Sequence, residues 1–101
     1  MEAFITYDVS ARQEDVKSGM VKLGYSDSRP GDQNGKSVTV YLPNTSLWKK
    51  DKELRTALSD IQTVIDNLNA TKAYSQEKIV LLRCIVVSAS PWFGIPGTGE
   101  R

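Results

Sequence analysis

The sequence predicts a small α+β domain with the element order β-α-β-β-α-β, and three observations support that class. Alternating apolar and polar residues, typical of half-buried strands, occur over residues 3–9 and 36–42. Apolar residues at helical spacing follow each of these strands, and a β-rich apolar run covers residues 78–88. With 101 residues and 40% hydrophobic content the chain has room for one core, so we assign residues 1–90 to a single domain and residues 91–101 to a tail.

The first strand and the first helix are predicted from residues 3–24. In the strand the odd-numbered residues form the core face, and Asp8 falls on the opposite face. Ser10 to Gln13 matches the capping box S-x-x-Q, which predicts a helix capped by Ser10, and Gly24 provides the stop. The apolar residues of this helix recur at i, i+4 and i+7: Val16, Met20 and Leu23.

A hairpin is predicted next along the chain. Residues 25–29 form a brief second strand, residues 30–35 are turn-forming, and the Asn-Gly pair within them suits a tight hairpin. Residues 36–42 form the third strand, which has one apolar face: Val38, Val40 and Leu42.

The clearest helix covers residues 51–70, after a loop at residues 44–48, and either Asp51 or Ser46 caps its start. After a polar break, the run at residues 78–88 is apolar on both faces, as expected of a strand buried between two layers. The helix has apolar residues at i, i+4, i+7, i+11 and i+14: Leu54, Leu58, Ile61, Ile65 and Leu68.

Two split β-α-β halves in this order define the ferredoxin-like arrangement, in which two helices cover one face of a four-stranded antiparallel sheet. The other face is left open, and it would carry Phe4, Thr6, Thr39, Tyr41 and one side of the last strand. Such a surface is more apolar than a monomer usually exposes. Because two-fold homodimers are the commonest assemblies, we expect a second copy to cover it.

Composition excludes several classes of chemistry. The chain has no histidine, hence no imidazole base, no Ser-His or Cys-His nucleophile pair and no histidine metal ligand. Its one cysteine, Cys84, forms neither an internal disulfide nor a thiolate cluster.

A net charge of +1 gives no overall field toward nucleic acid or anionic membrane. No signal pattern and no apolar run of about 20 residues is present, so we expect a cytoplasmic protein without membrane contact.

Asp8 is the best candidate for a chemical group, because it ends the first strand just before the predicted helix. A carboxylate there is held by the sheet and reaches solvent, which suits metal or phosphate chemistry. A carboxylate in this position also commonly caps the next helix, and both interpretations stay open.

The segment Thr6 to Ser10, at the end of a first strand in a small ferredoxin-like chain, resembles the start of the CRISPR-associated adaptation nuclease-like subunits. Residues 37–42 are a looser match to a later strand of that family. The resemblance implies a dimer in which Asp8 faces its copy across the two-fold axis as a divalent-metal ligand. Some members cleave RNA or DNA, and others are DNA-binding scaffolds. The fold also resembles toxin and antitoxin ribonucleases, so a phage-defence or toxin–antitoxin system is expected.

In a nuclease of this kind, two Asp8 carboxylates would disfavour each other's ionisation, and a Mg²⁺ ion between them would relieve this cost. The ion would polarise a scissile phosphate and activate water. Ser10 would orient water or phosphate, and Arg12 would hold a phosphate oxygen. The alternatives are that Ser10 is a helix cap and that Arg12 is a solvated residue of the first turn.

A second group of candidates sets an aromatic side chain beside basic ones, the combination that stacks a base and neutralises phosphate. Asp51 and Glu53 dilute the positive charge, and the alternative is a solvated helix start with Trp48 folded back as an apolar plug. Phe4 and Tyr41 could likewise stack RNA bases on the open face, or serve as core or dimer contacts. The predicted nucleic-acid-binding residues are Lys36, Trp48, Lys49, Lys50, Lys52 and Arg55.

The tail combines Trp92, Phe93 and Ile95 with two prolines and three glycines. It is too apolar to remain solvated, so we expect Trp92 and Phe93 to pack on the chain's own sheet, on a second copy or on a different protein. Three functions stay open: a metal-dependent nuclease centred on Asp8, a nucleic-acid scaffold, and a protein-binding regulator or inhibitor that uses the open sheet face and the tail.

Overall fold

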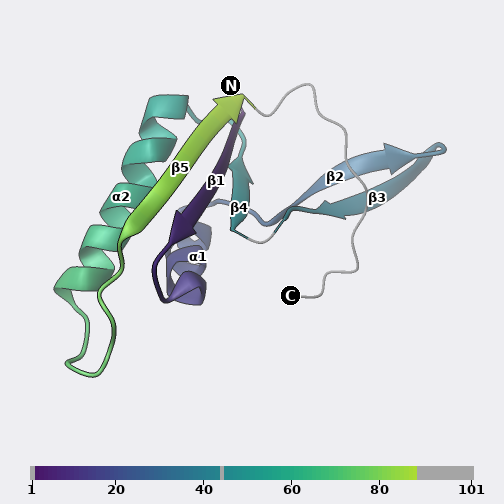
Figure 1. Cartoon of the computed structure of the whole chain (residues 1–101). Coiled ribbons are helices and arrows are strands. Elements are labelled where there is room, and N and C mark those ends of the chain that lie inside the picture. Colours follow the sequence, from purple (N-terminus) through teal and green to yellow (C-terminus); the bar gives the residue numbers. More distant parts are fainter. Residues whose placement is uncertain (1, 44, 89–101) are drawn as a thin grey trace.

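The structure is a computed structural model that describes residues 2–43 and 45–88. Over these residues it is an α+β structure with two helices and two antiparallel sheets, in agreement with the predicted class (Figure 1). No helix within the described residues is long and apolar enough to cross a membrane. The elements in chain order are β1 (Ala3–Val9), α1 (Gln13–Lys22), β2 (Ser28–Gln33), β3 (Lys36–Tyr41), β4 (Ser46–Lys49), α2 (Leu54–Ala70) and β5 (Leu81–Ser88).

The larger sheet has three antiparallel strands in the order β4-β1-β5, with β1 in the centre. Successive residues of a strand point to opposite faces, so every second residue of β1 is buried. Helix α2 packs on β1 and β5, and α1 packs on α2 (Figure 1). The core lies between this face and the helices and consists of Ala3, Ile5, Tyr7, Val9, Val16, Met20, Tyr25, Leu47, Ala57, Ile61, Val64, Ile65 and Ile79.

The predicted four-stranded sheet is not formed by the described residues. Strand β3 pairs with β2 in a separate two-stranded ribbon, which projects from the body and gives the molecule extents of 51 × 29 × 21 Å (Figure 1). Asn34 and Gly35 have φ of 54° and 79°, so they form a two-residue turn that joins β2 to β3 as antiparallel neighbours. The tight hairpin is therefore confirmed, but β2 runs through Pro30 and Gly31, which the sequence assigns to the turn.

The place beside β1 is taken instead by β4, a strand in a region predicted to be loop. Leu47 of β4 is fully buried in the core, while Trp48 lies on the opposite face of the sheet. Trp48 also anchors the ribbon: its backbone bridges Ser26, and its indole Nε1–H donates to the carbonyl of Ser28. The guanidinium of Arg29 lies 4.3 Å from the centre of the indole ring.

Both helices begin without the predicted side-chain caps. The N-cap of α1 is Arg12, with a left-handed φ of 56°, and that of α2 is Glu53, and neither makes a side-chain cap hydrogen bond. Ser10 lies outside the helix because the chain turns at Arg12 first. Ser46 belongs to β4, and Asp51, with φ of 55°, lies in a turn.

Strand β5 differs from the predicted doubly buried strand. It is an edge strand that begins at Leu81, and its helix-side residues pack on the core. On the other face Leu82, Ile85 and Val87 are 57%, 62% and 46% exposed, because no second layer of described residues covers them. The open apolar face predicted from the sequence therefore exists, on a sheet of three strands.

Gly19 provides a test of the helix packing. A Cβ at this position of α1 would lie 2.6 Å from Cγ1 of Val64 in α2, and Val64 is buried and β-branched. Alanine normally stabilises a helix by about 1 kcal/mol relative to glycine, but overpacking costs about 1–3 kcal/mol. We expect Gly19→Ala to lower the free energy of unfolding by about 1 kcal/mol in urea titrations. The exposed neighbour Ser18→Ala should leave it nearly unchanged, and a gain of stability in Gly19→Ala would contradict this packing.

Candidate functional site

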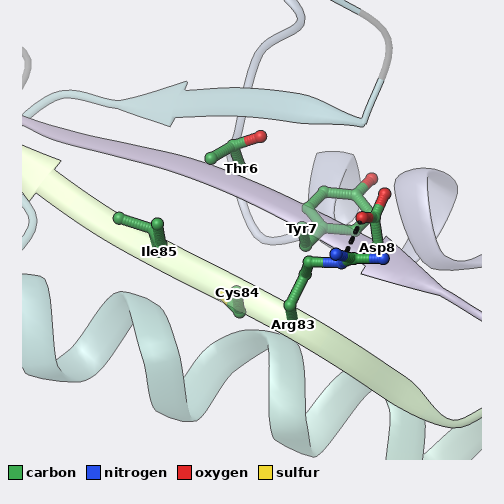
Figure 2. A pocket seen from close by; sticks show the side chains of 6 residues that line it. All are labelled: Thr6, Tyr7, Asp8, Arg83, Cys84 and Ile85. Atoms are coloured by element: carbon green, nitrogen blue, oxygen red, sulfur yellow. Dashed lines mark ion pairs between the residues drawn. The ribbon is translucent and has the colours of Figure 1, made fainter.

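Asp8 lies near the end of β1, on the face of the sheet opposite the helices. Its cross-strand neighbour on β5 is Arg83, whose Nε lies 2.7 Å from Asp8 Oδ2. Figure 2 shows the arginine reaching across from β5 to the carboxylate. The two side chains are 50% and 78% exposed, so the ion pair is well solvated and contributes little to stability.

A shallow hollow of about 190 Å³ adjoins this ion pair. It has polar groups at one end and an apolar side chain, that of Ile85, at the other (Figure 2). Burial raises the pKa of the Cys84 thiol, so the thiol is protonated near neutral pH and is a weak nucleophile. The lining residues are Thr6, Tyr7, Asp8, Arg83, Cys84 and Ile85.

A β-bulge at this end of the sheet sets the position of the ion pair. Asp8 is paired with Arg83 but Val9 is paired with Leu81, so Leu82 is an extra residue in β5. The bulge bends the strand beside Asp8 and leaves Leu82 exposed.

Ser10 follows the bulge and joins the end of β1 to the chain that enters β5. Its backbone N–H donates to the carbonyl of Val80 at 2.9 Å, and its Oγ accepts the N–H of Val80 at 2.8 Å. The predicted helix cap is therefore wrong. The hydroxyl instead accepts the N–H of a residue 70 positions further along the chain, as a backbone carbonyl of a paired strand would.

Arg12 has a separate partner. Its Nε donates to Asp15 Oδ2 at 2.7 Å within the first turn of α1, so it is not the free solvated residue of the alternative interpretation. The three predicted catalytic residues lie close in sequence, yet each bonds to a different group: Asp8 to Arg83, Ser10 to Val80 and Arg12 to Asp15.

The residues around Asp8 do not fit a resident Mg²⁺ ion within one chain. Magnesium prefers several oxygen ligands in octahedral geometry. Among the described residues, no group of three or more histidine, cysteine, aspartate or glutamate side chains is placed to hold a metal. The Asp8 carboxylate is also engaged by Arg83. Further ligands would have to come from outside the described residues of one chain.

The predicted nucleic-acid-binding residues are spread over several elements. Lys36 lies at the tip of the ribbon, whereas Trp48 and Lys49 belong to β4. Lys52 forms an ion pair with Asp60 at 3.0 Å, and Arg29 lies over the ring of Trp48. The indole therefore packs where β4 meets the ribbon, whereas the alternative interpretation placed Trp48 at the start of a helix. The exposed cations of this group are Lys36, Lys50 and Arg55.

The predicted interface residues separate into three groups. Phe4 and Thr6 lie on the open face, where Val87 and Ile85 of β5 are their cross-strand neighbours. Tyr41 belongs to β3 in the ribbon, so its assignment to the open sheet face is corrected. The other two members, Trp92 and Phe93, lie outside the described residues.

Two structural partnerships were missed from the sequence. Arg83 is the single charged residue of the run at residues 79–87, and that was the available signal for a partner of Asp8. The buried Tyr25 hydroxyl donates to Asp60 Oδ2 at 2.8 Å. Burial, together with the Asp60 carboxylate, raises the pKa of Tyr25 well above its ordinary value. This contact fastens α2 to the chain after α1.

Neither the family models, nor the curated proteins, nor the solved structures with which the chain was compared gave a significant match.

Two substitutions compare how much the Asp8–Arg83 ion pair and the Ser10–Val80 hydrogen bond stabilise the end of β1. We expect Asp8→Ala to change the free energy of unfolding by less than about 1 kcal/mol, because it removes an exposed ion pair. Ser10→Ala should cost about 0.5–1.5 kcal/mol, the usual net contribution of one hydrogen bond, since the Val80 N–H exchanges the Ser10 hydroxyl for water. Urea unfolding followed by circular dichroism measures both. A larger loss in Asp8→Ala than in Ser10→Ala would show that the ion pair, not the Ser10 contact, holds this end of the sheet.

Proposed function

We propose that this protein acts as a non-catalytic interaction module that forms a homodimer through the open face of the β4-β1-β5 sheet. The observation that carries the proposal is the row of apolar side chains on that face. Val87 lies beside Phe4 and Ile85 beside Thr6, and the two β5 side chains are about half exposed or more. Contiguous apolar surface of this kind marks interaction sites on soluble proteins.

The arrangement of the strands supports a reduced ferredoxin-like fold. Strands β5, β1 and β4 lie in the order that the last, first and third strands take in a ferredoxin-like sheet. The bridge between Ser26 and Trp48 lies beside β4, where the remaining strand of such a sheet would pair. In this proposal the ribbon is an extension of the central hairpin, and both helices leave the same face open.

A second copy suits this face because the face is close to self-complementary. The charged side chains that β1 and β5 present on it, Asp8 and Arg83, are opposite in sign and 2.7 Å apart, so these two strands meet their copies without net repulsion. A two-fold axis would also allow each Asp8 to approach the other copy's Arg83, while Ile85 and Val87 pack across the interface. Two-fold contacts of this isologous kind are the commonest in soluble oligomers.

Sedimentation of the full chain tests the dimer. We expect Ile85→Lys to weaken dimerisation at least tenfold, about 1.4 kcal/mol, because it places a charge in an apolar contact. Leu58→Lys is the matched control, since Leu58 is an exposed apolar residue of α2 on another surface, and it should leave the dimer intact. A wild-type chain that remains monomeric at all accessible concentrations would sink the proposal, as would equal effects of the two variants.

A second candidate function is the metal-dependent nuclease implied by the resemblance, in a defence or toxin–antitoxin system. The specific observation in its favour is that Asp8 is half exposed beside a hollow on the same open face. A dimer through that face would add a second Asp8, which a single chain lacks. The exposed cations Lys36, Lys50 and Arg55 would then contact phosphates.

Cleavage assays separate this candidate from the interaction module. Labelled single- and double-stranded RNA and DNA are incubated with the wild-type chain and Mg²⁺, Mn²⁺ or chelator. If Asp8 holds the metal, Asp8→Ala should lower a metal-dependent rate at least a hundredfold while the fold is retained. Ser18→Ala is a control outside the site. Metal-independent cutting, or equal cutting by Asp8→Ala, would exclude a metal centre at Asp8.

A further inference from the structure

The two edges of the three-stranded sheet are unequal (Figure 1). Strand β4 has four residues, and its outer side holds the bridge between Trp48 and Ser26. Strand β5 has eight residues, and no described strand pairs with its outer side. Beyond the bulge at Leu82, residues 83–88 contain no lysine, no proline and no further bulge, the features that normally keep an edge from pairing. Within the described residues, β5 is thus an unprotected edge.

The hydrogen-bond pattern identifies which backbone groups point outward from β5. The N–H of Tyr7 donates to the carbonyl of Thr45 at 3.1 Å, so the backbone groups of Tyr7 point toward β4. These directions alternate along a strand, so Tyr7 and its neighbour Cys84 form a non-hydrogen-bonded pair. The N–H and C=O groups that point away from β1 are therefore those of Cys84, Val86 and Ser88.

We infer that β5 of a second copy pairs antiparallel with this edge, so that two sheets join into one sheet of six strands around a two-fold axis. A two-fold axis allows only registers in which outward-pointing groups meet each other. With Ile85 on the axis, Cys84 lies opposite Val86 of the second copy, and the two residues exchange both of their backbone hydrogen bonds. The symmetry repeats this pair on the other side of the axis.

The side chains of β5 select this register. With Ile85 on the axis, two exposed apolar side chains meet, and the two copies of Arg83 lie about 13 Å apart along the strands. With Cys84 on the axis, the two Arg83 side chains become diagonal neighbours about 7–8 Å apart, and their like charges repel. With Val86 on the axis, the paired stretch shortens to residues 84–88. The Ile85 register pairs the whole stretch of residues 82–88.

The helices leave room for this pairing. Helix α2 packs on both β1 and β5, so its axis lies inside the sheet edge. With strands about 4.8 Å apart, an axis midway between β1 and β5 sets the two α2 helices about 10 Å apart. Packed helices lie about 8–10 Å apart, so the second α2 extends the helix layer without a clash.

The six-stranded sheet has one continuous open face. Three strands about 4.8 Å apart, each with seven residues at about 3.3 Å, span roughly 330 Å² of flat area, and six strands span roughly 660 Å². Stable interfaces bury about 800 Å² of accessible surface on each partner. Edge pairing therefore doubles the surface of the proposed open-face contact, and the two contacts together make a tetramer. The edge contact rests on β5 alone, and only the tetramer rests on the proposed function.

Amide hydrogen exchange, followed residue by residue by NMR, tests the edge in the unsubstituted protein. We expect the N–H groups of Cys84 and Val86 to exchange at least tenfold more slowly in the associated protein than in the monomer, the two states being assigned by sedimentation. The Ile85 N–H, which bonds β1, is the internal control and should be protected in both. Fast exchange of Cys84 and Val86 in the associated protein would overturn the edge contact. Slow exchange of both in the monomer would overturn the second copy as the occupant.

Two substitutions separate the edge contact from the open-face contact. Val86→Pro removes an outward N–H, so we expect it to weaken edge pairing at least tenfold, whereas Val86→Thr keeps the N–H and is the matched control. Thr6→Lys places a charge on the open face of the central strand, away from the edge. Circular dichroism verifies that each variant is folded, and sedimentation measures its association.

The pattern of association distinguishes the two contacts. If both exist, each of Val86→Pro and Thr6→Lys should leave a dimer. Association that is lost in Val86→Pro and kept in Thr6→Lys would support the edge contact and contradict the open-face dimer. Association that is kept unchanged in Val86→Pro and lost in Thr6→Lys would contradict the edge contact and leave the proposed function standing.

Discussion

The burial of one face of β1 is the constraint on which the rest of the structure depends. Ala3 and Ile5 are fully buried, and burial of a side chain the size of Ile5 contributes about 1.5–3 kcal/mol. Because β1 is the central strand, its two edges also fix the positions of β4 and β5. The same pleat that buries the odd-numbered residues turns Phe4, Thr6 and Asp8 to the opposite face, so the core and the open face have one cause.

The open face is apolar at one end and ionic at the other. Phe4, Ile85 and Val87 favour contact with another apolar surface, whereas the pair of Asp8 and Arg83 is neutral as a unit and solvated. We therefore propose the interaction module ahead of the nuclease. A catalytic carboxylate needs partners that converge on the substrate, and the three residues expected to do so bond instead to separate groups.

The sequence was most informative where local chemistry alone decides the structure. Asn34-Gly35 predicts its turn because both residues tolerate positive φ, and the spacing of Leu54, Ile61 and Ile65 predicts α2. It was least informative where distant segments compete. Strand β4 is only four residues long, and no periodicity distinguishes it from loop until β1 offers a partner.

The sequence predicted where the residues of the candidate site lie, but not which groups they contact. The position of Asp8 at a strand end follows from alternation, but its partner Arg83 lies 75 residues away, and only the sheet register joins them. Likewise Ser10 matches a capping box, yet its hydroxyl accepts the N–H of Val80, because the chain turns before the helix begins. Tertiary pairing replaced a local motif at that position.

The apolar residues that precede the bulge at Leu82 could face the core in either of two ways. The sequence Ile79-Val80-Leu81-Leu82 is apolar at every position, so either alternation would present a chemically acceptable face to the core. The choice of phase is therefore made by polar groups. The Asn69 side chain bonds both the N–H and the C=O of Ile79 at 2.8 Å. Ser10 likewise bonds both backbone groups of Val80, through its hydroxyl and its own N–H. The side chains of Asn69 and Ser10 thus decide which residues of this apolar segment face the core. Ile79 is buried and Val80 is exposed.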